Sequence, residues 1–216
     1  MSTEQTSPVK WTDQQFRVWQ WQNDMKQPVC PIEKFGKITA LPEFAKNQIG
    51  FLKEEASFEL QGAIQAGDRA DLADALADSL FVALGLLNII GAPCANAPKL
   101  NFSKLPAENQ IEVILKALDR AVLPQDVLDY TSDLVTCLEE IATRNNIPLA
   151  ECFDRVCKSN DTKFWTSDEV AYAKEDPKYD GWSMTRVSQN GWVVKDQNGK
   201  VRKSPHFEQP DFGGLL

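Results

Sequence analysis

The chain has 216 residues, of which 43% are hydrophobic and 25% are charged, so it can form one medium-sized domain with a core. Its formal net charge of −8 disfavours a nucleic-acid partner, because binding of a polyanion normally needs a basic face. We find no apolar signal core and no apolar run long enough to span a bilayer, and therefore expect no membrane partner. Five scattered cysteines without a CxxC motif favour a reducing cytoplasm.

Helical periodicity dominates the first 160 residues. Thr12 or Asp13 is expected to cap the first helix, and Pro42 to begin the second. Gly67 is expected to end the second helix, and Asp68 to cap the third. In chain order, the expected helices cover about residues 12–25, 42–65, 69–90, 107–123, 124–144 and 148–158.

The last quarter of the chain has a different pattern. Residues 161–190 show no sustained period, whereas residues 192–195 and 200–203 flank Asn198-Gly199, a typical β-hairpin turn. We therefore predict an all-α helical bundle with a small C-terminal β-hairpin. Residues 1–160 would form the helical domain, and residues 161–216 a C-terminal extension packed on it.

Two clusters of carboxylates lie on either side of Gly67, within residues 51–91. Residues three or four apart share one face of a helix, so each cluster presents several carboxylates together. If the two helices pack antiparallel, these groups converge and repel one another, which favours a hard divalent cation among them. A solvated acidic face is the alternative. The carboxylates are Glu54, Glu55 and Glu59 in the first cluster and Asp71, Asp74 and Asp78 in the second.

The segments FLKEEASFEL and DLADALADSLFVALGLLNIIG resemble the core of the all-α nucleoside-triphosphate pyrophosphohydrolases. These are the MazG-like proteins, whose relatives act on dCTP, dUTP and phosphoribosyl-ATP. Further along the chain, SNDTK at residues 159–163 is similar to the SNxxK motif of this family. GKVRKSP at residues 199–205, followed by Pro210-Asp211, is similar to the GKxxKxPxY…PDL ending of many bacterial and phage members.

The first acidic motif departs from the family pattern EExxE, because Phe58 stands in the third glutamate's place and Glu59 follows it. One alignment keeps Glu54 and Glu55 in register and displaces Glu59 by one residue. The other takes Glu55 and Glu59 as the ligands, with Ala56 in place of the middle glutamate, and the spacing of four residues between the two ligands favours it.

The second acidic motif lacks the family's ExxD form, because Ala75 stands where its glutamate would be. Asp74, four residues before Asp78, is expected to substitute for it. With this substitution, the resemblance implies metal binding by Glu55, Glu59, Asp74 and Asp78, and a catalytic role for Glu54 or Glu55.

Four further residues are candidates for substrate binding. Asn160 and Lys163 follow a helix end, where an amide and a cation could hold phosphate or sugar, although Lys163 could equally be an ordinary exposed lysine. Trp19 could stack on a nucleobase or simply pack its helix on the core. Lys53 neighbours the acids and could bind substrate or only balance their charge.

The resemblance implies a hydrolase that converts a (deoxy)nucleoside triphosphate to the monophosphate and pyrophosphate, in control of nucleotide pools. Mg²⁺ suits ligation by oxygen alone, and Mn²⁺ would be tolerated. A cytoplasmic homodimer or tetramer is implied, and a phage-encoded protein acting in the host cytoplasm stays open. The departures in both motifs would also suit a non-catalytic nucleotide-sensing or dimeric interaction module of the same fold.

Overall fold

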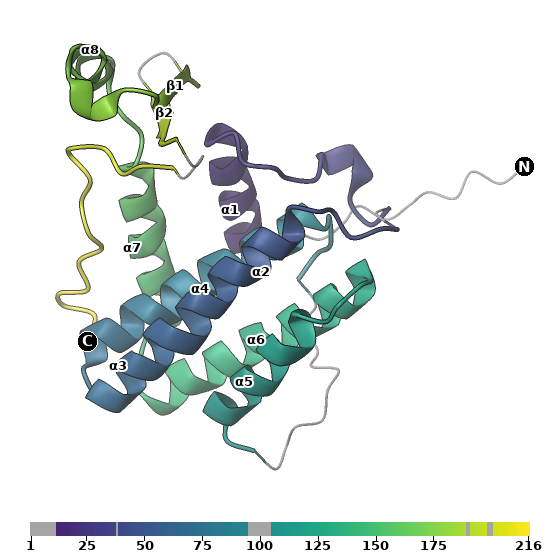
Figure 1. The fold of residues 1–216 in the computed structure, drawn as a ribbon. Coiled ribbons are helices and arrows are strands. Elements are labelled where there is room, and N and C mark those ends of the chain that lie inside the picture. Colours follow the sequence, from purple (N-terminus) through teal and green to yellow (C-terminus); the bar gives the residue numbers. More distant parts are fainter. Residues whose placement is uncertain (1–11, 38, 95–104, 189–190, 198–200) are drawn as a thin grey trace, which may run out of the picture.

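The computed structural model describes residues 12–37, 39–94, 105–188, 191–197 and 201–216. Most of these residues lie in a bundle of helices, and a smaller unit with α8 and two strands stands at one end of it (Figure 1). The predicted fold, mostly helical with a small antiparallel hairpin, is confirmed at this level. The helices of the bundle are α1 (Asp13–Asp24), α2 (Ala45–Lys53), α3 (Leu60–Ala66), α4 (Arg69–Ile89), α5 (Ala107–Leu118), α6 (Pro124–Arg144) and α7 (Leu149–Asp161).

The helix ends follow from local sequence. The Thr12 hydroxyl accepts a hydrogen bond from the Gln15 N–H at 3.1 Å, and so caps α1. Asp68 caps α4 in the same way, and Pro124 occupies the first turn of α6, where its missing N–H costs nothing. Gly67 ends α3 with a φ of 71°, a left-handed conformation that glycine adopts without strain. The predicted caps at Thr12, Asp68 and Gly67 are therefore confirmed.

Helix α4 is the centre of the bundle and packs against α1, α2, α3, α6 and α7. It is long and apolar enough to cross a bilayer, but 83% of its most apolar window is buried within the protein, as in a core helix. Leu76, Leu80, Leu84 and Leu87 are all buried. Because α4 is buried nearly all round, the few acidic side chains on it must lie where the surrounding helices leave a gap.

The second predicted helix is continuous but not uniform. Between α2 and α3 lies a π-helical segment, η2 (Glu54–Glu59), in which the Leu60 N–H donates to the Glu55 carbonyl, five residues back. A π turn holds one more residue than an α turn, and such turns are rare and frequent at functional sites. The acidic segment of the sequence thus coincides with the irregular turn of the helix.

The C-terminal unit contains α8 (Ser167–Glu175), the 3-10 turn η3 (Pro177–Tyr179), β1 (Ser183–Arg186) and β2 (Trp192–Lys195). Residues 161–190 show no sustained period in the sequence, yet α8 and β1 lie there. Thr166 and Glu169 form a capping box that begins α8, a start signal stronger than the weak periodicity that follows it.

The strand predicted over residues 192–195 is present, and it has a second partner besides the predicted one. β2 pairs antiparallel with β1, with Ser183 opposite Lys195. The predicted pairing with residues 200–203 is present in part among the described residues. Lys195 forms an antiparallel bridge with Val201, and the Arg202 N–H donates to the Val194 carbonyl at 2.8 Å. The predicted Asn198-Gly199 turn lies outside the described residues.

The C-terminal tail returns to the helical bundle. The Ser204 hydroxyl donates to the Thr162 carbonyl at 2.7 Å, and the Ser159 hydroxyl donates to the Glu208 carbonyl at 2.6 Å. Phe212 is buried in the main hydrophobic core. These contacts fix residues 203–208 beside the C-terminal end of α7, which is where the candidate site lies.

Candidate metal and phosphate site

The structure brings four of the predicted carboxylates together, two from the π segment and two from α4. Burial, then the charges of Asp78 and Glu59, raise the pKa of Glu55 to about 8. Burial and the neighbouring Asp74 raise the pKa of Asp78 to about 6. The pKa of Asp74 is also raised, first by burial and then by Glu59. Such mutual repulsion arises only when like charges share a poorly hydrated space.

Two carboxylate oxygens in this cluster have no partner. Glu55 Oε2 and Asp74 Oδ1 are buried and accept no hydrogen bond from the described residues, although the Glu55 carboxyl lies close enough to Glu59 for a shared proton to raise its pKa. Buried acceptors are almost always satisfied, so these two atoms suit a bound ion. Within the same described residues, no three Asp, Glu, Cys or His side chains are already spaced to coordinate one ion. A set of carboxylate oxygens of this kind would suit a hard divalent cation.

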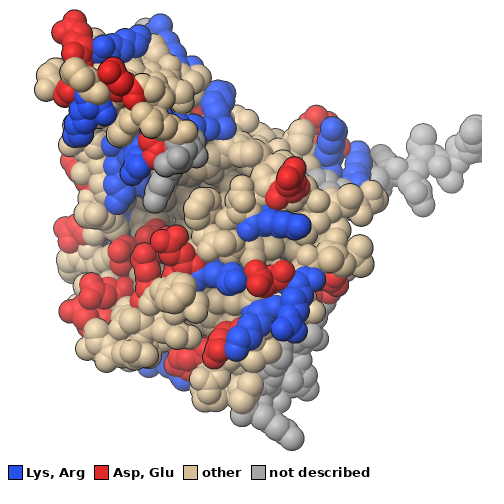
Figure 2. Space-filling view, viewed as in Figure 1, with Lys and Arg blue, Asp and Glu red and all other residues tan. Residues whose placement is uncertain are grey.

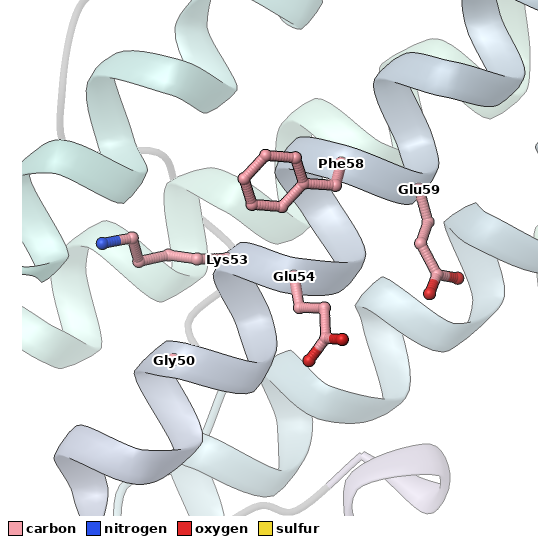
Figure 3. Close-up of a pocket in the computed structure, with 5 residues that line it drawn as sticks. All are labelled: Gly50, Lys53, Glu54, Phe58 and Glu59. Atoms are coloured by element: carbon pink, nitrogen blue, oxygen red, sulfur yellow. The ribbon is translucent and has the colours of Figure 1, made fainter.

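Figure 3 shows the outer side of the π segment, where a pocket of about 530 Å³ is lined by Gly50, Lys53, Glu54, Phe58 and Glu59. Glu54 and Glu59 point to one side of the helix, whereas Lys53 and Phe58 point to the other. Lys53 pairs with Asp119 at 3.1 Å, so the structure directs this candidate substrate-binding residue away from the acids. Glu54 is exposed and can reach solvent beside Glu59.

Two lysines face the carboxylates. Lys163, just beyond α7, has its Nζ 5.8 Å from the ring centroids of both Trp21 and Phe207. Burial lowers the pKa of Lys163, while Asp78, Glu55 and Asp74 act in the opposite direction. The Nζ of Lys203 lies 4.1 Å from the Phe207 ring centroid, and its charge acts on Asp74 and Asp78. Both ammonium groups thus make cation–π contacts with aromatic rings and lie close enough to the carboxylate cluster to interact with it electrostatically.

The surface of the molecule agrees with this arrangement. Figure 2 shows acidic side chains gathered along one side of a hollow, with lysine and arginine side chains of the C-terminal unit on its other side. Carboxylates can bind a divalent ion, and lysines can bind phosphate. A hollow with both kinds of side chain is therefore suited to a metal-bridged polyphosphate.

The other predicted substrate-binding residues have structural partners. Asn160 is 4% exposed, and its carbonyl accepts a hydrogen bond from the Trp21 indole N–H at 3.0 Å. Trp19 donates to the Cys30 carbonyl at 3.0 Å, and its ring is parallel to that of Phe16, with centroids 6.1 Å apart. The structure therefore places Trp21, rather than Trp19, beside Lys163.

Sequence reasoning did not select Trp21 or Phe207 as site residues. Nothing in the sequence distinguishes Trp21 from Trp19, because both lie in one short helix. Phe207 lies in a tail without regular structure, where position cannot be inferred from periodicity. The sequence did contain a signal for Lys203, because this residue is the second lysine of the GKxxK-like segment.

Comparisons with known proteins give one distant relative. The chain is 24% identical over 212 residues to uncharacterized protein L479 of Acanthamoeba polyphaga mimivirus, covering 81% of this chain and 84% of the viral protein. No model of a known protein family matches the chain, and no solved structure matches it.

Proposed function

We propose that the chain is a metal-dependent nucleoside triphosphate pyrophosphohydrolase of the MazG-like, all-α type. The observation that carries this proposal is the cluster of Glu55, Asp74 and Asp78, which repel one another and include two unpartnered buried oxygens. Lys163 and Lys203 face that cluster. Phosphate hydrolysis commonly needs a divalent ion and cations around the same phosphates, and this site can supply both kinds of ligand.

The π segment supports the proposal by accounting for the departure in the first motif. Relative to EExxE, Glu59 is displaced by one residue. The i+5 hydrogen bond from the Leu60 N–H to the Glu55 carbonyl accommodates one extra residue in this turn. Glu59 can thus keep its place beside Glu55 and the α4 aspartates despite the added residue.

The proposed reaction is attack of water on the α-phosphorus, which breaks the bond from that phosphorus to the bridging oxygen and releases the monophosphate and pyrophosphate. Glu55, Glu59, Asp74 and Asp78 would hold Mg²⁺ or Mn²⁺, which when bound supplies charge neutralisation and a more acidic water. Glu54 or Glu55 would take the proton from the attacking water. Lys163 and Lys203 would hold the phosphate oxygens.

The test is release of pyrophosphate from a panel of ribo- and deoxyribonucleoside triphosphates with Mg²⁺ or Mn²⁺. Glu55→Gln and Asp78→Asn should each abolish release, because each removes a charged ligand while keeping the shape of the side chain. Asp71→Asn, an exposed aspartate of the same helix, is the matched control and should remain active. Nucleotide binding without turnover on any substrate would instead indicate the non-catalytic sensing module.

We also propose that the protein forms a homodimer through the α2 side of the bundle. Phe58 is 76% exposed and Phe51 is 52% exposed on this side. Apolar side chains this large are commonly covered in an assembly when they lie together. Sedimentation at micromolar concentration tests this point, and a monomeric mass would contradict it.

A further inference from the structure

A second pocket, of about 520 Å³, lies in the C-terminal unit. Its lining combines aromatic rings with cations. The rings are those of Trp165, Tyr179 and Trp182, and the cations are Lys178, Arg202 and Lys203.

The aromatic wall of the pocket is built on a buried residue. Trp165 is 3% exposed, and its indole N–H donates to the Arg202 carbonyl at 3.0 Å. Tyr179 stands edge-on to Trp165 at 5.7 Å and to Trp182 at 4.9 Å between ring centroids. Tyr179 and Trp182 are only half-buried, so this fixed stack leaves part of their surface accessible from the pocket.

Arg202 lines the same pocket beside these rings. Its guanidinium lies 5.7 Å from the Trp182 ring centroid and pairs with Asp196 through Nη2. Its Nε is buried and donates to no acceptor in the described residues. The guanidinium therefore adds a planar cationic group to the aromatic wall of the pocket.

Lys203 connects the pocket with the carboxylate cluster. It borders the pocket, and its charge acts on both Asp74 and Asp78. A ligand with a planar ring at one end and phosphates at the other could therefore place the ring on Trp182 and the phosphates beside Lys203. A nucleotide has this chemistry.

We propose that the pocket of Tyr179, Trp182 and Arg202 is the nucleobase subsite, which holds the base by stacking on these planar groups. This proposal rests on the proposed function, since it concerns the same substrate. Stacking of one base on an aromatic side chain changes affinity by about 10- to 100-fold. We expect a nucleoside monophosphate to bind more tightly than ribose 5-phosphate by a factor in this range.

The test uses the full chain in EDTA, titrated by calorimetry with nucleoside monophosphates and with ribose 5-phosphate as the probe without a base. Trp182→Leu keeps apolar bulk in the half-buried position but removes the ring, and should abolish the preference for nucleotides. Tyr172→Leu is the matched control, because Tyr172 is 67% exposed on α8 and lies outside the pocket lining. Lys178→Gln, at an exposed position of the lining, is a second variant that should fold and should weaken binding of the monophosphates.

The proposal is overturned if monophosphates bind no better than ribose 5-phosphate, or if Trp182→Leu retains the full preference. Its failure is distinguishable from failure of the proposed function, because Mn²⁺ binding to the carboxylates is measured separately. Base-dependent binding through Trp182 without Mn²⁺ binding would support the pocket and contradict the hydrolase. Mn²⁺ binding and turnover with an unchanged Trp182→Leu variant would contradict the pocket alone.

Discussion

Replacing Asp78 by asparagine should stabilise the metal-free protein. The fold raises the pKa of this carboxyl from 3.8 to about 6, by burial and by the charge of Asp74. A folded-state pKa above the unfolded value means that ionisation of Asp78 destabilises the folded state at neutral pH. The difference corresponds to about 3 kcal/mol if fully expressed, and partial exposure of the side chain reduces it to about 1–2 kcal/mol.

A gain of this size should raise the melting temperature of Asp78→Asn by about 2–8 °C in EDTA at pH 7.5. Differential scanning calorimetry measures it directly. The same variant should lose the stabilisation that Mg²⁺ or Mn²⁺ gives the wild type, because ligand binding to the folded state stabilises it by mass action. The substitution would thus make the protein more stable and less able to bind metal.

Asp71→Asn is the control for this experiment, since Asp71 is exposed on the same helix. It should change the melting temperature less and should retain the response to metal. A melting temperature of Asp78→Asn in EDTA that is equal to or below that of the wild type would refute the argument that these carboxylates repel one another in the folded protein.

Three further predictions concern other parts of the molecule. Lys163→Met should raise KM for a nucleoside triphosphate by about 10-fold or more, because it removes a cation facing the phosphates, whereas Lys53→Met should leave KM unchanged. Steady-state kinetics of both variants check this prediction, and equal effects of the two substitutions would contradict it. Burial alone would raise the pKa of Glu169, but hydrogen bonds from Thr166 and then from His206 lower it by more, so the net shift of this pKa is downward. The stability that Glu169 adds should be present above about pH 4.3, the usual pKa of a glutamate in an unfolded chain, and should be lost as the pH falls through the folded-state pKa. The melting temperatures of Glu169→Gln and the wild type, measured from pH 3 to 7, should therefore converge at the acid end. Phe58→Ser should shift the sedimentation of the protein toward the monomer, and an unchanged dimer would exclude this face as the interface.

Much of the helical bundle could be predicted because its signals are local. Thr12, Asp68 and Gly67 determine helix ends through interactions with residues within one turn. The carboxylate cluster could also be anticipated, because spacing within a helix fixes which side chains share a face. The π turn could not, since the register of a helix with one extra residue depends on its packing against α4, which is not part of the local sequence.

The C-terminal unit was less predictable because its contacts are distant in sequence. The strand over residues 192–195 and part of its pairing with residues 200–203 could be predicted from the Asn-Gly signal, but the second partner, β1, could not. Lys203 and Phe207 reach the site through hydrogen bonds that join the tail to the end of α7. Nothing in the local sequence around Phe207 indicates that contact, so this part of the site required the structure.

The most direct test of the proposed hydrolysis is to follow the reaction in ¹⁸O-labelled water by ³¹P NMR, with a nucleoside triphosphate and Mg²⁺. Attack on the α-phosphorus predicts ¹⁸O in the monophosphate, unlabelled pyrophosphate in equal amount, and no reaction with Glu55→Gln. Label in pyrophosphate, release of orthophosphate as the first product, or no hydrolysis of any nucleotide would contradict the account.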